Sequence, residues 1–88
     1  MDLQLIIKLK SSYEEWHQTF VNHVDVRSKI CNENKTLVAK ANESTALVTI
    51  FDVDMAGMGA MMADPDFQKM NEPLVEEISP YSITPLKP

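Results

Sequence analysis

Residues 3–9 read LQLIIKL, and apolar residues occupy every second position of this stretch. Successive side chains of a β-strand point to opposite faces, so a period of two predicts a strand with one wholly apolar face. That face consists of Leu3, Leu5, Ile7 and Leu9. The opposite face is mixed and consists of Gln4, Ile6 and Lys8. We therefore expect helices to pack against the first of these two faces.

The segment after this strand has the pattern of an amphipathic helix. Ser12 followed three residues later by Glu15 forms a capping box, which starts a helix. Apolar residues then recur at spacings of three and four, and they are Tyr13, Trp16, Phe20 and Val24. The turn-forming stretch CNENK at residues 31–35 follows. We expect one helix from about Ser12 to Ser28.

Two further strands are expected at residues 36–41 and 44–53, joined by the polar stretch NES in a hairpin. The second strand is apolar on both faces, which is typical of a strand in the interior of a sheet. One face carries Ala46, Val48 and Ile50, and the other carries Leu47 and Phe51.

The last third of the chain predicts a helical region and a final strand. Asp54 can cap a helix through MAGMGAMMA, and Asp64 with Pro65 begins a further helical turn. Pro73 ends this region. The final strand lies around residues 75–83, and Pro80 within it favours an edge position or a bulge. Residues 1–84 then form a single domain, and residues 85–88 form an irregular tail.

The predicted order βαββαβ favours a ferredoxin-like α+β fold, with a four-stranded antiparallel sheet and two helices on one face. The face of the sheet without helices would leave Ile6, Leu47 and Phe51 in water, which favours a homodimer through that face. The candidate interface residues are Gln4, Ile6, Lys8, Leu47, Thr49 and Phe51. The alternative is a monomer with a half-exposed sheet face.

The order of elements, the segment YEEWHQTFVNH and the stretch DPDF resemble the dimeric α+β barrel superfamily. Trp16, Phe20 and His23 match its W-x-x-x-F-x-x-H pattern, and residues 64–70 match its short second helix. The superfamily that the chain resembles includes proteins similar to antibiotic-biosynthesis monooxygenases. It implies a barrel-like dimer of two sheets and a ligand cavity between sheet and helices, but it implies no single activity.

Composition excludes several classes of function. The chain has 88 residues, enough for one domain, and a formal net charge of −5, which argues against a nucleic acid or an anionic membrane as partner. No apolar run is long enough to span a membrane. With one cysteine and no signal-peptide pattern, we expect a reducing, cytoplasmic location. No cofactor-binding motif is present, and we expect no cofactor.

If a cavity exists, its expected ligand contacts are Trp16, Phe20, His23, Met55, Met58, Met62 and Tyr81. Some of these residues have a structural alternative: Trp16 and the methionines could fill the core, and His23 could bond to the backbone. His17 and His23 are six positions apart and cannot chelate one metal ion, so no metal site is expected. Asp54 is explained by helix capping, and Cys31 is expected to be unreactive.

No catalytic set of residues is recognisable in the sequence, and three classes of function stay open. The first is a binding or regulatory module that holds a small apolar ligand. The second is a cofactor-independent monooxygenase-like or isomerase-like enzyme acting on a small aromatic compound. The third is an assembly subunit without a ligand. A closed cavity with His23 or Tyr81 pointing into it would favour an enzyme, and a space filled by Trp16, Phe20 and methionines would favour the assembly subunit.

Overall fold

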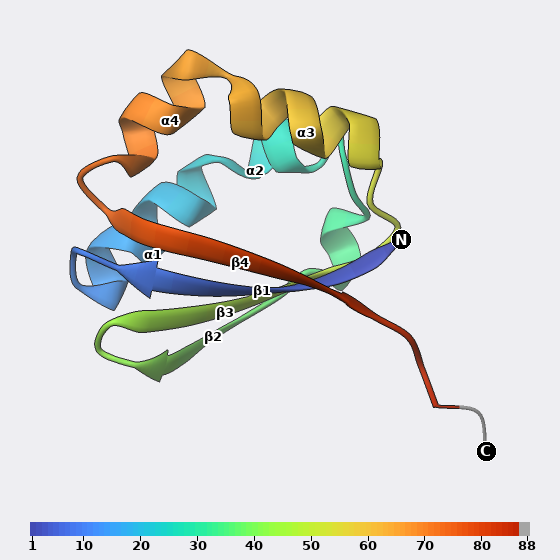
Figure 1. Cartoon of the computed structure of the whole chain (residues 1–88), viewed down its shortest axis with the longest axis horizontal. Helices are drawn as coiled ribbons and strands as arrows, with labels where there is room; N and C mark the ends of the chain where they lie inside the picture. The colour runs from blue at the N-terminus through green and yellow to red at the C-terminus, as the bar shows by residue number, and fades with distance from the viewer. Residues whose placement is uncertain (87–88) are drawn as a thin grey trace.

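A four-stranded antiparallel sheet forms one layer of the protein, and helices form the other (Figure 1). The computed structural model describes residues 1–86. The strands lie in the order β2-β3-β1-β4. Their bounds are Asp2–Leu9 for β1, Leu37–Asn42 for β2, Thr45–Ile50 for β3 and Val75–Ile83 for β4. The predicted α+β class with four antiparallel strands is confirmed.

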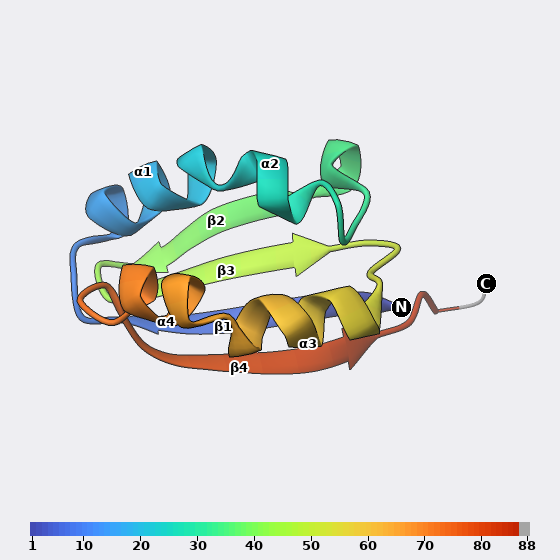
Figure 2. The same ribbon diagram turned by 90° about the horizontal axis from the view of Figure 1, so that it is seen from above.

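The helices all lie on the same side of the sheet (Figures 1 and 2). Their bounds are Tyr13–Asn22 for α1, Val24–Arg27 for α2, Met55–Ala63 for α3 and Pro65–Asn71 for α4, and a 3-10 turn η1 spans Glu33–Lys35. Seen from above, α1 and α2 lie towards β2, whereas α3 and α4 lie towards β1 and β4 (Figure 2). Among the described residues, no helix combines the length and the hydropathy needed to cross a membrane.

Side-chain caps begin three of the four α-helices where the sequence predicts them. The Ser12 hydroxyl accepts a hydrogen bond from the backbone N–H of Glu15 at 3.2 Å. The carboxylates of Asp54 and Asp64 accept from the second residue of α3 and of α4 at 3.1 and 2.8 Å. These bonds satisfy N–H groups that have no partner inside the helix, so each cap fixes where its helix starts.

The single helix expected from Ser12 to Ser28 is interrupted at His23, so the prediction of one continuous helix is wrong. His23 has φ −94° and ψ 10°, which is outside the helical region. The Phe20 carbonyl accepts from the backbone N–H of His23 at 3.2 Å and from Arg27 Nη1 at 2.8 Å. A side chain therefore takes the carbonyl that would otherwise continue the α-helix, and the chain turns before α2 begins.

The core lies between the helices and the apolar face of β1, as expected. Leu3, Ile7 and Leu9 are buried, and the facing side chains of β3 are buried beside them. Trp16 of α1 is 4% exposed and belongs to the same cluster, together with Met58 of α3. The helix carrying Trp16 and Phe20 thus packs on the Leu3/Leu5/Ile7/Leu9 side, which confirms that prediction.

The other face of the sheet carries no helix in the part of the chain that the structure describes (Figure 1). Residues expected on this face lie opposite one another across β1 and β3: Gln4 opposite Thr49, Ile6 opposite Leu47, and Lys8 opposite Thr45. The expected strand ran on to residue 53, and this prediction is wrong for Phe51, because β3 ends at Ile50. The Phe51 carbonyl instead accepts from the Asn32 backbone N–H at 2.9 Å, and Asp52 has φ 55°, so the chain turns away from the sheet there.

The final strand β4 lies at an edge of the sheet, as Pro80 predicts, since an edge strand does not need every backbone N–H for pairing. Residues 84–86 have no regular structure, and the chain leaves the domain there (Figure 1). The rest of the predicted tail, residues 87–88, lies outside the described residues.

The two glycines of α3 should respond in opposite ways to alanine. A Cβ at Gly59 meets nothing within 4 Å, so Gly59→Ala should raise the free energy of unfolding by about 0.5–1 kcal/mol through helix propensity. A Cβ at Gly57 would lie 2.9 Å from Ile30 Cγ2, so Gly57→Ala should lower it by about 1–3 kcal/mol. Urea unfolding of both variants measures the difference, and equal stabilisation by both would contradict the close packing of α3 on Ile30.

Candidate functional site

A cavity of about 80 Å³ lies between the sheet and the helices. Its floor is the apolar face of the two central strands, formed by Leu5, Ile7, Val48 and Ile50. Along β1 and β3 these side chains alternate with the residues of the open face, so they point towards the helices, and they are buried there. The cavity therefore rests on buried side chains of the sheet.

Methionines cover the cavity on the side of α3 and α4. Met58, Met61 and Met62 recur at spacings of three and four along α3, and Met70 adds a fourth thioether from α4. Their unbranched side chains can change rotamer without breaking a hydrogen bond, so this wall can adapt its shape. Met55 lies at the start of the same helix but is 47% exposed and does not line the cavity.

Aromatic rings form the remaining apolar surface. Trp16 and Phe20 of α1 both line the cavity, with ring centroids 5.1 Å apart. Phe67 of α4 lines it from the opposite side, and its ring lies 5.3 Å from the ring of His23. The two helical regions therefore meet through one aromatic contact at the edge of the cavity.

Polar groups are confined to this edge. Thr19 and His23 come from α1 and its C-terminal cap, and Asn71 comes from α4. All three side chains are half-exposed, whereas the floor is buried. Partial burial, and secondarily the positive charge of Arg27, lower the pKa of His23 below its ordinary value. The imidazole is therefore neutral at pH 7 and offers one donor and one acceptor.

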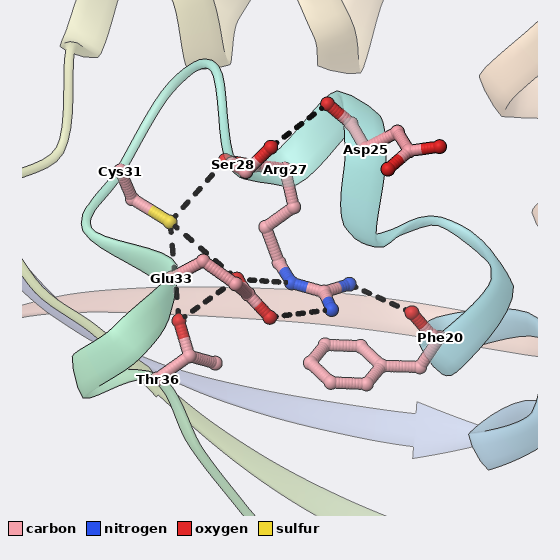
Figure 3. A network of polar contacts seen from close by, with 7 residues as sticks. All are labelled: Phe20, Asp25, Arg27, Ser28, Cys31, Glu33 and Thr36. Carbon is pink, nitrogen blue, oxygen red and sulfur yellow. Dashed lines mark hydrogen bonds and ion pairs between the residues drawn. The ribbon is translucent and has the colours of Figure 1, made fainter.

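Arg27 of α2 is a buried charged residue whose guanidinium holds one end of the site together (Figure 3). Its Nε and Nη2 donate to the two carboxylate oxygens of Glu33, both at 2.8 Å, and Nη1 donates to the Phe20 carbonyl at 2.8 Å. The guanidinium carbon also lies 3.7 Å from the centroid of the Phe20 ring. The bidentate pair keeps the pKa of Glu33 below its ordinary value, so the pair is ionised but has no net charge.

Cys31 belongs to the same network rather than to the cavity. Its thiol donates to the Arg27 carbonyl at 3.4 Å and lies 3.9 Å from the Thr36 hydroxyl (Figure 3). Burial raises the pKa of the thiol, which is the state of an unreactive cysteine and agrees with the expectation from the sequence. Asp52 does not line the cavity either: its carboxylate is exposed, and its Oδ2 lies 3.7 Å from Lys35 Nζ.

The structure brings together most, but not all, of the residues expected to contact a ligand. Those that line the cavity are Trp16, Phe20, His23, Met58 and Met62. Tyr81 does not: it lies opposite Gln4 on the open face of the sheet and is 54% exposed. The helix-facing positions of β4 are instead Ile78 and Pro80, which lie opposite Ile7 and Leu5.

Sequence reasoning missed four cavity residues with polar or aromatic side chains: Thr19, Arg27, Phe67 and Asn71. Two of them carried a usable signal. Thr19 lies three residues after Trp16 and four before His23, which puts it on the same helix face, and Asn71 lies four residues after Phe67. Arg27 gave no such signal, because its position depends on the break in the helix at His23.

This arrangement is suited to binding an apolar molecule with a polar group at one end. The floor and walls are hydrocarbon, thioether and aromatic surface, and hydrogen-bonding groups gather at the edge alone. Within residues 1–86, no group of three or more His, Cys, Asp or Glu side chains is placed to hold a metal ion.

The Arg27–Glu33 pair should make stability depend on pH. Because the native pKa of Glu33 is lowered, the pair stabilises the fold above the unfolded-state value of about 4.3, and this contribution is lost as pH falls through the native pKa. Glu33→Gln should lower the free energy of unfolding at pH 7 by about 1–3 kcal/mol and flatten its acid dependence. Urea unfolding at pH 7 and pH 3 measures both effects.

Glu14→Gln is the matched control for this substitution, because the ion pair of Glu14 with Lys40, at 3.4 Å, is solvent-exposed and should contribute little. Equal destabilisation by the two variants would show that the buried pair has no special role.

Comparison with protein-family models, with curated proteins and with solved structures found no match to this chain.

Proposed function

We propose that this protein is a homodimeric binding or regulatory module that holds a small, mostly apolar molecule between its sheet and its helices. The observation that carries the proposal is the cavity of about 80 Å³ with an apolar floor and a polar edge. A water molecule needs about 10–15 Å³ of such volume, so the space exceeds an ordinary packing defect. A fully packed core, which an assembly subunit would have, leaves no such space.

The size of the cavity bounds the ligand. An apolar cavity of about 150 Å³ in another protein accepts benzene. The cavity here is about half of that, so a single ring would enter only if methionine side chains moved aside. Met58, Met61, Met62 and Met70 supply that adaptability, and the ligand class is therefore a molecule of one ring or a short chain.

A cofactor-independent enzyme of the monooxygenase or isomerase kind is the second candidate, and one observation favours it. His23 lines the cavity in its neutral form, so its free nitrogen could accept a proton from a bound molecule. Binding without chemistry is the simpler proposal, because Tyr81, the other group considered for that role, lies on the opposite face of the sheet.

The arrangement of elements supports a ferredoxin-like fold of the dimeric α+β barrel type as part of this proposal. The order β2-β3-β1-β4 places β3 between β2 and β1, so the helical connection from β1 to β2 passes over a strand that is later in the chain. The helices occupy one face alone (Figure 2). Such an arrangement leaves the other face free to pack on a second copy.

The open face is mixed in composition, but large apolar side chains extend across it. Its large apolar side chains span all four strands: Leu37 on β2, Leu47 on β3, Ile6 on β1, and Tyr81 and Ile83 on β4. Leu37 is 61% exposed in the single chain. A two-fold partner that presents the same face would cover this surface, which extends the interface expected from the sequence to both edge strands.

The polar groups at the centre of that face already have partners. The Thr49 hydroxyl donates to Gln4 Oε1 at 2.7 Å, and Gln4 Nε2 donates to the Val48 carbonyl at 3.3 Å. Covering the face would therefore leave neither side chain without a hydrogen bond, and the desolvation cost of dimerisation is low there. A cytoplasmic location is the remaining part of the proposal, supported by the free and buried thiol of Cys31.

Ligand binding can be tested with toluene as the probe, by amide chemical shifts in NMR spectra of the ¹⁵N-labelled protein. Shifts should concentrate on cavity residues such as Ile50, Met58 and Phe67, because the probe replaces empty space beside them. Val48→Phe adds a ring to the cavity floor and should abolish binding. Val48→Ile, a smaller addition, should weaken binding if the larger variant does not fold.

Val21→Phe is the control for these variants, since Val21 is 47% exposed on α1 and does not line the cavity. It should bind toluene as the unmodified protein does. Absence of shifts in the unmodified protein with toluene and with a polar analogue of the same size, or shifts confined to the open face, would contradict a ligand site in the cavity.

The homodimer can be tested by sedimentation of the unmodified protein and of Leu47→Glu. The unmodified protein should sediment as a dimer at micromolar concentration, and the variant as a monomer, because the new charge would be buried without a partner at the interface. Val21→Glu is the control, because Val21 is 47% exposed on α1, away from the sheet. A monomeric unmodified protein would contradict the proposed interface.

A further inference from the structure

The polar edge of the cavity has a feature that the apolar walls do not explain. Among the hydrogen bonds within residues 1–86, none involves the side chain of Thr19 or of His23. Asn71 Nδ2 donates to the Phe67 carbonyl at 3.1 Å, which leaves Asn71 Oδ1 without a partner inside the protein. Because no fully buried polar atom of the described residues is unpaired, these groups keep access to water or to the cavity.

The contact between His23 and Phe67 brings these groups to one place. Thr19 lies one helical turn before His23, and Asn71 lies one turn after Phe67. Figure 2 shows that α1 and α4 run in opposite directions, so positions 19 and 71 both lie towards the same end of the molecule from the contact. All four residues line the cavity. The edge is therefore one polar patch supplied by two helices.

Charge at this edge is balanced. Arg27 lines the cavity, but its guanidinium is held by both oxygens of Glu33, and three of its N–H groups are already used. His23 is neutral at pH 7, because burial and the charge of Arg27 lower its pKa. A carboxylate would find no unpaired positive charge here, and an ammonium group would meet the positive end of the Arg27–Glu33 pair.

The hydrogen-bonding capacity of the patch matches a hydroxyl group. A neutral imidazole supplies one donor and one acceptor, the Thr19 hydroxyl supplies both, and Asn71 Oδ1 supplies an acceptor. A hydroxyl can donate one bond and accept two, so it uses both kinds of partner at once. A hydrocarbon of the same size would displace water from these groups and replace none of its bonds.

We propose that Thr19, His23 and Asn71 form a subsite for a single neutral hydroxyl group, so that the cavity selects small alcohols over hydrocarbons and carboxylates of the same size. This inference rests on the proposed function, because it names the chemical class of the molecule held in the same cavity. The apolar part of the alcohol lies against the methionines and the aromatic rings, and its hydroxyl lies at the edge between α1 and α4.

The test compares three probes that share one ring: benzyl alcohol, toluene and benzoate, titrated by NMR at pH 7.5. Benzyl alcohol should bind about tenfold more tightly than toluene, the change expected for one well-formed set of hydrogen bonds. Benzoate should give no shifts at concentrations that saturate with benzyl alcohol. If benzyl alcohol and toluene bind the cavity equally, the subsite does not exist although the cavity still binds ligands. If none of the three binds, the proposed function itself fails.

Variants locate the preference on named side chains. Thr19→Val and Asn71→Leu keep the size of the side chain and remove the polar group. Each should lower the ratio of the affinity for benzyl alcohol to the affinity for toluene towards one, and leave toluene binding unchanged or stronger. His23→Phe should do the same. Thermal unfolding confirms that each variant is folded. If Asn71→Leu destabilises α4 by removing the hydrogen bond to the Phe67 carbonyl, Thr19→Val still tests the subsite. An unchanged preference in all folded variants overturns the proposal.

Discussion

The ion pair between the buried Arg27 and the partly exposed Glu33 is the interaction on which the rest of the site depends. Arg27 ends α1 by bonding to the Phe20 carbonyl, packs on the Phe20 ring and anchors η1 through Glu33. A buried charge without its partner is strongly destabilising, and the pairing of Arg27 with Glu33 therefore holds η1 beside α2. The pair thereby fixes the position of His23, which lies at the break that Arg27 creates.

The helical layer leaves space over the sheet because of its composition. The nine residues of α3 are all glycine, alanine or methionine, and Gly57 allows the helix to approach Ile30 closely. Methionine and alanine fill volume less firmly than leucine and isoleucine would at the same positions. The space of about 80 Å³ that they leave lies directly over buried side chains of the central strands, which is why we interpret it as functional.

Features governed by local chemistry could be predicted from the sequence. The period of two in β1 fixes its buried face, and Ser12, Asp54 and Asp64 fix where helices start, because each depends on residues within one turn or one strand. The break at His23 could not be predicted in this way. It requires the side chain of Arg27 to reach a carbonyl seven residues earlier, and the intervening sequence contains no glycine or proline.

The face of the sheet on which Tyr81 lies could not be predicted for a related reason. A strand displays alternate residues on opposite faces, so the face of Tyr81 follows from the register of β4 against β1, where Gln4 lies opposite it. Nothing in the sequence of β4 sets that register, because its apolar residues do not alternate strictly and Pro80 interrupts them. The same register places Ile78 over the cavity and thus links the edge strand to the site.

The cavity floor and the proposed dimer interface are the two faces of one sheet. Val48 forms part of the cavity floor, whereas Leu47 and Thr49, its neighbours along β3, point to the open face. Gln4, on the open face of β1, donates to the carbonyl of Val48 itself, so a polar side chain on one side of the sheet holds the backbone that carries the floor on the other. The Gln4–Thr49 hydrogen bond at the centre of the open face and the Val48 side chain in the cavity floor are therefore held by the same stretch of β3 backbone.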